Sequence, residues 1–104
     1  MSGTIVAYAR PTEEQVAKMK EIINSLGDKD LDKLQDHGVE EDELQEAKEV
    51  YIQALEDLLN NNYVDRDYRF CAAIYIQDLL DEVGVTQKQE LSVGGWDYIV
   101  QVVN

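Results

Sequence analysis

Apolar residues follow two different spacings along the chain, and these spacings predict its elements. Residues 4–10 (TIVAYAR) are β-branched and aromatic, which is typical of a short strand. After Pro11, apolar residues recur at three- or four-residue intervals, and Thr12 followed by Gln15 matches the capping box that begins many helices. The pattern predicts a strand and then a helix that begins at Thr12 and closes at Gly27.

The middle of the chain is predicted to be helical. Residues 28–38 carry two leucines in a short helical turn, and the segment from about Glu40 to Asn60 places its apolar side chains in one stripe. The three asparagines at 60–62 predict the end of this long helix, because Asn tolerates left-handed backbone conformations.

A further helix is expected to be capped by Asp65 or Asp67 and to run to Val83. Its segment 70–76 is apolar on every side, so we expect it to be the central buried helix. Cys71 lies in this segment, and we expect it to be a buried, unreactive thiol that packs as a small apolar residue.

The end of the chain predicts a hairpin. Segments 89–93 and 96–103 flank Gly94-Gly95, which is a two-residue turn signal. The last strand is apolar on both faces, so we expect it to lie in the middle of the sheet with the N-terminal strand on its far side. Ile99 and Val103 share the face that a single helical layer would leave uncovered, and such a patch suggests a partner or a second copy.

These elements predict one α+β domain over residues 1–104. We expect a small three-stranded antiparallel-type sheet, formed by the N-terminal strand and the C-terminal hairpin, with three to four helices packed on one face.

Composition narrows the functional classes. The 104 residues include 22 Asp and Glu against nine Lys and Arg, a formal net charge of −13. This charge repels phosphate backbones and argues against direct binding to nucleic acid. A single Cys fits a reducing compartment, so we expect a cytoplasmic protein. The longest apolar run, residues 70–76, is far shorter than the roughly 20 residues that span a bilayer, and no signal peptide is evident.

Catalytic and metal-binding motifs are sparse. Asp28, Asp30 and Asp32 resemble the start of a calcium loop, but Lys33 and Val39 occupy the positions that need Gly and Glu. The single His37 follows a predicted helix end, where its charged form would complement the helix dipole. We expect no cofactor, no metal and no enzymatic activity. The alternative is a metal-dependent enzyme that uses Asp65 and Asp67.

The acidic residues of the long helix suggest a docking face. They recur three or four positions apart opposite the apolar stripe, and like charges at this spacing destabilise a helix by about 0.2–0.5 kcal/mol each. An ordinary solvated surface is the alternative. Tyrosines after the helix could supply anchoring contacts or equally close the edge of the core. The residues predicted to bind a partner are Asp42, Glu46, Glu49, Glu56, Tyr63, Asp65, Asp67 and Tyr68.

These features favour a non-catalytic inhibitor of a basic, nucleic-acid-handling protein. Examples are an immunity protein or antitoxin for a nuclease toxin, or a phage anti-CRISPR or anti-restriction protein that mimics DNA in part. The long helix carries about one charge per 5 Å, from a rise of about 1.5 Å per residue, whereas duplex DNA carries one per about 1.7 Å. The alternative is a housekeeping or regulatory scaffold domain that forms a homodimer through its sheet face.

Overall fold

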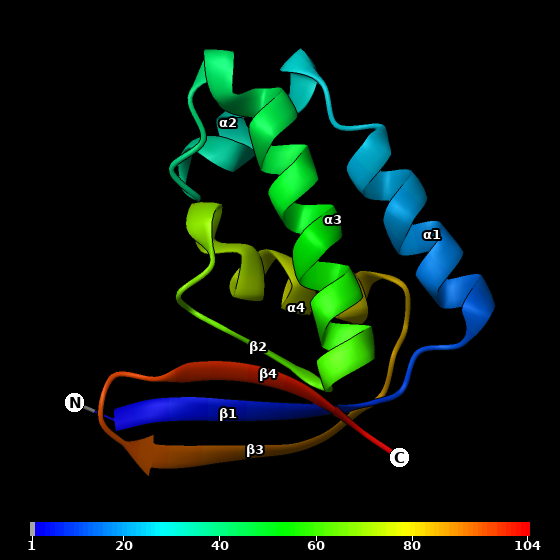
Figure 1. Cartoon of the computed structure of the whole chain (residues 1–104), viewed down its shortest axis with the longest axis vertical. Coiled ribbons are helices and arrows are strands. Elements are labelled where there is room, and N and C mark those ends of the chain that lie inside the picture. The colour runs from blue at the N-terminus through cyan, green and yellow to red at the C-terminus, as the bar shows by residue number, and fades with distance from the viewer. Residues whose placement is uncertain (1) are drawn as a thin grey trace.

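The computed structural model describes residues 2–104 and has an α+β fold (Figure 1). Four helices and a four-stranded mixed sheet form two layers. Three short 3-10 turns connect them, at Asp28–Asp30, Glu41–Glu43 and Arg69–Cys71. The elements in chain order are β1 (Ser2–Ala9), α1 (Glu13–Asn24), α2 (Leu31–Gln35), α3 (Leu44–Asn61), β2 (Tyr63–Asp65), α4 (Ala72–Glu82), β3 (Gln87–Gly94) and β4 (Tyr98–Val103).

The sheet confirms an interior position for the last strand but not the predicted hairpin. Its strand order is β2-β4-β1-β3, so β1 lies between the two C-terminal strands. Ile5 of β1 is paired with Leu91 of antiparallel β3 on one side and with Ile99 of parallel β4 on the other. The three-stranded, antiparallel sheet expected from the sequence is therefore a four-stranded, mixed one, with the short strand β2 on the far side of β4.

The connection from β3 to β4 explains how this arrangement forms. Gly95 adopts the left-handed conformation of a turn, with φ +97°, but residues 95–97 continue across the start of β1. The connection must cover the distance from β3 to β4 across β1, which is two strand spacings or about 9.6 Å, and three extended residues can span this distance. The backbone N–H of Thr4 donates to the carbonyl oxygen of Asp97 at 2.8 Å, which fixes the crossing. A Gly-Gly pair indicates that the chain reverses, but it does not indicate which strand will pair with the strand that precedes the reversal.

The helices cover one face of the sheet, as predicted, and Figure 1 shows them on the same side of it. Val6 and Tyr8 of β1 and Val100 and Val102 of β4 are buried in the core that α3 and α4 complete. Because side chains alternate along a strand, Ile5 and its cross-strand partners Leu91 and Ile99 face away from the helices. We call this side the open face of the sheet. β3 lies at the edge, and its side chains are exposed apart from half-buried Val93.

Helix boundaries confirm most of the local signals. Thr12 caps α1 through the predicted capping box, with Gln15 N–H donating to Thr12 Oγ1 at 3.1 Å and Thr12 N–H donating to Gln15 Oε1 at 2.9 Å. The helix ends at Asn24 and not through Gly27, whose φ of −146° is extended backbone. Asn62 ends α3 in the left-handed conformation, as its sequence predicted.

The last helix begins later than predicted. Residues 63–65 form β2 because fully buried Val64 pairs with Val100, which draws this segment into the sheet. Phe70 and Cys71 both have positive φ, and α4 starts only after them. The prediction of a buried Cys71 is therefore wrong: its side chain is exposed.

The predicted caps of this helix are corrected as well. The Asp65 carboxylate accepts the backbone N–H of Asp67 at 3.0 Å, which closes a local turn and caps no helix. α4 is also not buried on every side, because Ile74 is 42% exposed. Across residues 2–104, no helix combines the length and the apolar character needed to span a membrane.

Candidate functional site

The carboxylates of the long helix and of the turn before it lie on its outer side. Ala47, Tyr51 and Leu58 are buried on the inner side of α3, and the carboxylates occupy the opposite part of the helical circumference. Asp42 and the α3 carboxylates of Glu46 and Glu49 are exposed, whereas that of Glu56 is half-buried. We call Asp42, Glu46, Glu49 and Glu56 the α3 acidic face.

Cations neutralise little of this face. Arg69 pairs with Glu46 and, at 3.5 Å, with Glu43, and these are the two ion pairs found within residues 2–104. Lys48 turns away, because its Nζ donates to the carbonyl oxygen of Leu26 at 3.1 Å. Most of the 22 carboxylates of the chain therefore have no cationic partner within 4.0 Å in the described part of the protein.

The tyrosines predicted to flank this face lie in different places. Tyr68 packs beside α3, half-buried, and its hydroxyl donates to Asp57. Burial, and next the Asp57 carboxylate, raise the pKa of Tyr68 to about 12. Tyr63 is paired with Gln101, whose two neighbours in β4 are buried in the core, so the Tyr63 side chain lies on the open face of the sheet.

The aspartates after α3 are separated in the same way. Asp65 is paired with Ile99, so its side chain shares the open face with Tyr63, while Asp67 is exposed in the following loop. The structure therefore brings the four residues of the α3 acidic face together with Tyr68 alongside, and it places Tyr63 and Asp65 on another surface.

Charge is distributed unequally between the two layers. The four strands contain three charged residues, Asp65, Lys88 and Glu90, and the remaining carboxylates are in helices, turns and loops. The open face of the sheet carries exposed apolar side chains instead: Tyr63 is 49% exposed, Leu91 46% and Val103 36%. The molecule thus has an anionic helical side and a nearly neutral, apolar sheet side.

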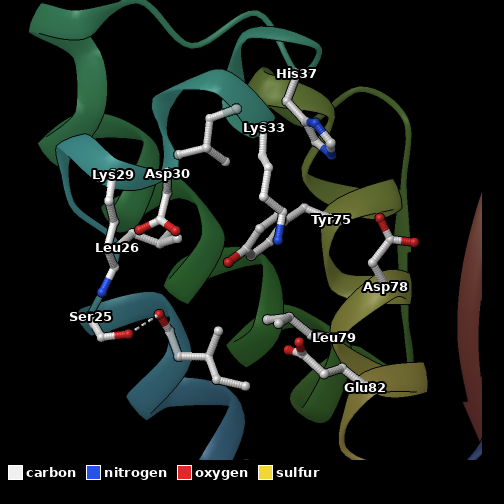
Figure 2. Close-up of a pocket in the computed structure, with 12 residues that line it drawn as sticks. Ser25, Leu26, Lys29, Asp30, Lys33, His37, Tyr75, Asp78, Leu79 and Glu82 are labelled. Atoms are coloured by element: carbon white, nitrogen blue, oxygen red, sulfur yellow. Dashed lines mark hydrogen bonds between the residues drawn. The ribbon is translucent and has the colours of Figure 1, made fainter.

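A second feature is a pocket of about 350 Å³ among the helices (Figure 2). The end of α1, the segment from the turn at Asp28–Asp30 through α2, and α4 form its walls. Its apolar lining comes from all three: Ile22, Leu26, Leu34 and Leu79.

The charged residues of the pocket are divided between facing elements. Lys29 and Lys33 belong to the turn and to α2, and Asp78 and Glu82 belong to α4 (Figure 2). Asp30 lies beside the lysines, and its carboxylate accepts the backbone N–H of Gly27 at 2.9 Å. No ion pair within 4.0 Å joins the two walls in the part of the chain that the structure describes.

Tyr75 lies between these walls. Its ring stacks on Tyr51, with ring centres 4.0 Å apart and planes inclined by 10°. Burial raises the pKa of Tyr75 to about 12, and the carboxylates of Glu82, Asp30 and Asp78 add to the effect in that order. Three carboxylates and two lysines thus line the pocket.

His37 also lines the pocket, and it directly follows the C-terminal end of α2, as the sequence predicted. Both ring nitrogens are buried and have no hydrogen-bond partner within residues 2–104. The imidazole meets the Tyr75 ring edge-on, with centres 6.0 Å apart and planes at 85°. Sequence reasoning did not identify this pocket, because its two charged pairs, each spaced four residues apart, lie about 45 positions from one another along the chain.

Metal-ligating groups do not gather in the described part of the chain. Within residues 2–104, no three His, Cys, Asp or Glu side chains are placed to hold one metal ion. Asp65 and Asp67 are linked to each other by the local turn described above, so their arrangement gives no support to a metal-dependent enzyme. Comparison with protein-family models, curated proteins and solved structures finds no match for this chain.

Proposed function

We propose that the protein is a non-catalytic docking module that acts in the cytoplasm as an inhibitor of a basic, nucleic-acid-handling protein. The partner would be a nuclease toxin or a nucleic-acid-binding defence complex. The basic site with which the partner would otherwise bind phosphates would bind the α3 acidic face.

The observation that carries this proposal is the lack of neutralisation on the acidic face. Arg69 alone forms ion pairs within residues 2–104, and of the α3 acidic face it contacts only Glu46. Unpaired carboxylates on one side of a small protein raise the association rate with a cationic partner and disfavour anionic competitors. The four carboxylates of this face extend over 14 residue steps, which at a rise of about 1.5 Å per residue places them about 7 Å apart on average, so the support is for a docking surface with only partial mimicry of DNA.

The proposal is tested with two triple variants of equal charge. The first, Asp42→Asn with Glu49→Gln and Glu56→Gln, removes three carboxylates from the face and leaves Glu46 paired with Arg69. The second, Glu21→Gln with Glu90→Gln and Asp97→Asn, removes three exposed carboxylates elsewhere. Both change the net charge by the same amount, so an effect of total charge and an effect of location are separated.

The wild-type protein, immobilised at low salt, is used to isolate partners, and the Kd of each purified partner is then measured for all three forms. We expect the first variant to weaken binding about tenfold and the second to leave the Kd within about twofold. Binding should also weaken as salt shortens the screening length from about 10 Å at 0.1 M. Equal effects of the two variants, or a Kd indifferent to salt, would contradict the proposal.

A homodimeric scaffold is the second candidate, and the apolar open face favours it. Tyr63 in β2, Val103 in β4 and Leu91 in β3 are all exposed there, so apolar side chains extend across the sheet, on a surface with little charge to keep two copies apart. Sedimentation equilibrium tests this function: a dimer that is indifferent to salt and is dissociated by Leu91→Gln with Val103→Gln would support it. A monomer at all concentrations would remove it.

A further inference from the structure

The pocket between α1, α2 and α4 has positively charged side chains on one wall and negatively charged side chains on the other. Lys29 and Lys33 lie on one wall and Asp78 and Glu82 on the other, and no ion pair within 4.0 Å connects these groups across the described residues. Figure 2 shows Lys33 extending between the walls toward the Tyr75 ring, whereas Lys29 extends toward Ser25, away from Lys33. The pocket therefore holds charges of both signs that the protein leaves unpaired.

This charge distribution discriminates among ligand classes. A simple anion would meet Asp30, Asp78 and Glu82 at close range, and the net charge of −13 would repel it from a distance. A simple cation would meet the two lysines. A ligand with one charge of each sign and no net charge can satisfy both walls and is not repelled as it approaches.

Size and lining narrow the class further. A volume of about 350 Å³ is at the low end of small-molecule pockets, which span roughly 300–1,000 Å³. Ile22, Leu26, Leu34 and Leu79 line it with aliphatic surface. The space suits a molecule of amino-acid size whose uncharged part is aliphatic.

We propose that this pocket binds a free amino acid with an aliphatic side chain. Its carboxylate is held by Lys33, its ammonium group by Asp78 and Glu82, and its side chain by the leucines. The site is distinct from the α3 acidic face, so the protein would have a small-molecule ligand in addition to any protein partner.

The test uses three probes of nearly equal shape. L-leucine carries both charges, isopentylamine only the ammonium group and 4-methylpentanoate only the carboxylate. Each is titrated at neutral pH into isotopically labelled full-length protein while backbone amide resonances are followed by NMR. We expect L-leucine to shift resonances of residues 29–37 and 75–82 saturably, with a Kd at least about tenfold lower than that of either analogue.

Two variants and two controls connect the binding to the walls. Lys33→Met and Asp78→Asn should each raise the Kd for L-leucine about tenfold, and both side chains are exposed, so the fold should tolerate the changes. Lys18→Met and Asp97→Asn remove the same charges at exposed positions outside the pocket and should leave the Kd unchanged.

Three results would overturn the proposal. They are no saturable shift with L-leucine up to about 10 mM, equal affinity for either single-charge analogue, and equal effects of wall and control variants. None of these results bears on the α3 acidic face, so the two proposals fail independently.

Discussion

Replacing Gly3 by Ala tests the crossing of the β3–β4 connection over β1, which is the feature of the fold that the sequence did not indicate. An ideal Cβ at Gly3 would lie 2.5 Å from the carbonyl oxygen of Asp97 and 2.9 Å from its backbone nitrogen. Ordinary contacts of a Cβ atom begin near 3.4 Å. Both obstructing atoms belong to the backbone, so no side-chain rotation can relieve the overlap.

The magnitude follows from what must move. Restoring normal contact requires the loop and the strand to separate by about 1 Å, which lengthens the 2.8 Å hydrogen bond from Thr4 N–H to Asp97 beyond its useful range. Overpacking of this kind costs about 1–3 kcal/mol, and the lost hydrogen bond about 1 kcal/mol. The lower backbone entropy of Ala returns about 0.5–1 kcal/mol. The expected net loss of unfolding free energy is about 2 kcal/mol.

Urea unfolding followed by circular dichroism measures this loss, and a thermal scan should show a Tm lower by about 10 °C. Gly94→Ala is the matched control. Gly94 lies in β3 opposite Ser2, and a Cβ there has no atom within 4 Å, so its effect should stay within about 0.5 kcal/mol. If Gly3→Ala is as stable as Gly94→Ala, the connection does not cross β1 as closely as the structure indicates.

Three further predictions concern the tyrosines and the cysteine. Tyr51→Phe should lower the unfolding free energy by about 1–3 kcal/mol, because the buried Tyr51 hydroxyl donates to the carbonyl oxygen of Phe70 at 2.9 Å. The control Tyr63→Phe, at an exposed position, should change the unfolding free energy little. Equal effects of the two variants in urea unfolding would contradict the prediction. Folding raises the pKa of Tyr68 and Tyr75 from 10.0 to about 12, so unfolded chains ionise first and stability should fall as the pH rises from about 10 to 12. In a Tyr63→Phe background, tyrosinate absorbance should then appear together with loss of the circular dichroism signal, and ionisation of Tyr68 or Tyr75 in a protein that is still folded would refute the reasoning. Cys71 should react with Ellman's reagent in the native state as fast as an exposed thiol, and protection until unfolding would show that it is buried.

The chain by itself determined the features that depend on neighbouring residues. The capping box at Thr12 and the left-handed Asn62 arise within one turn of helix, where side-chain oxygens and backbone torsions act directly. The α+β class and the single helical layer also followed from the period of the apolar residues. The outward position of the α3 carboxylates followed from the same period, because burying the apolar stripe of a helix exposes its opposite side.

Tertiary structure alone decided which distant segments meet. The chain reverses after Gly94 as predicted, yet it does not form a two-residue hairpin turn, and β1 lies between β3 and β4, because a strand that is apolar on both faces gains most by lying inside the sheet. Pairing of Val64 with Val100 likewise made Asp65, a predicted helix cap, the last residue of a strand. Cys71 precedes α4 in a left-handed conformation and is exposed. The pocket depends on α2 and α4 lying face to face, and neither segment alone encodes that contact. Torsional preferences act over a few residues, whereas strand order and cavities result from the burial of surfaces that are remote in the chain.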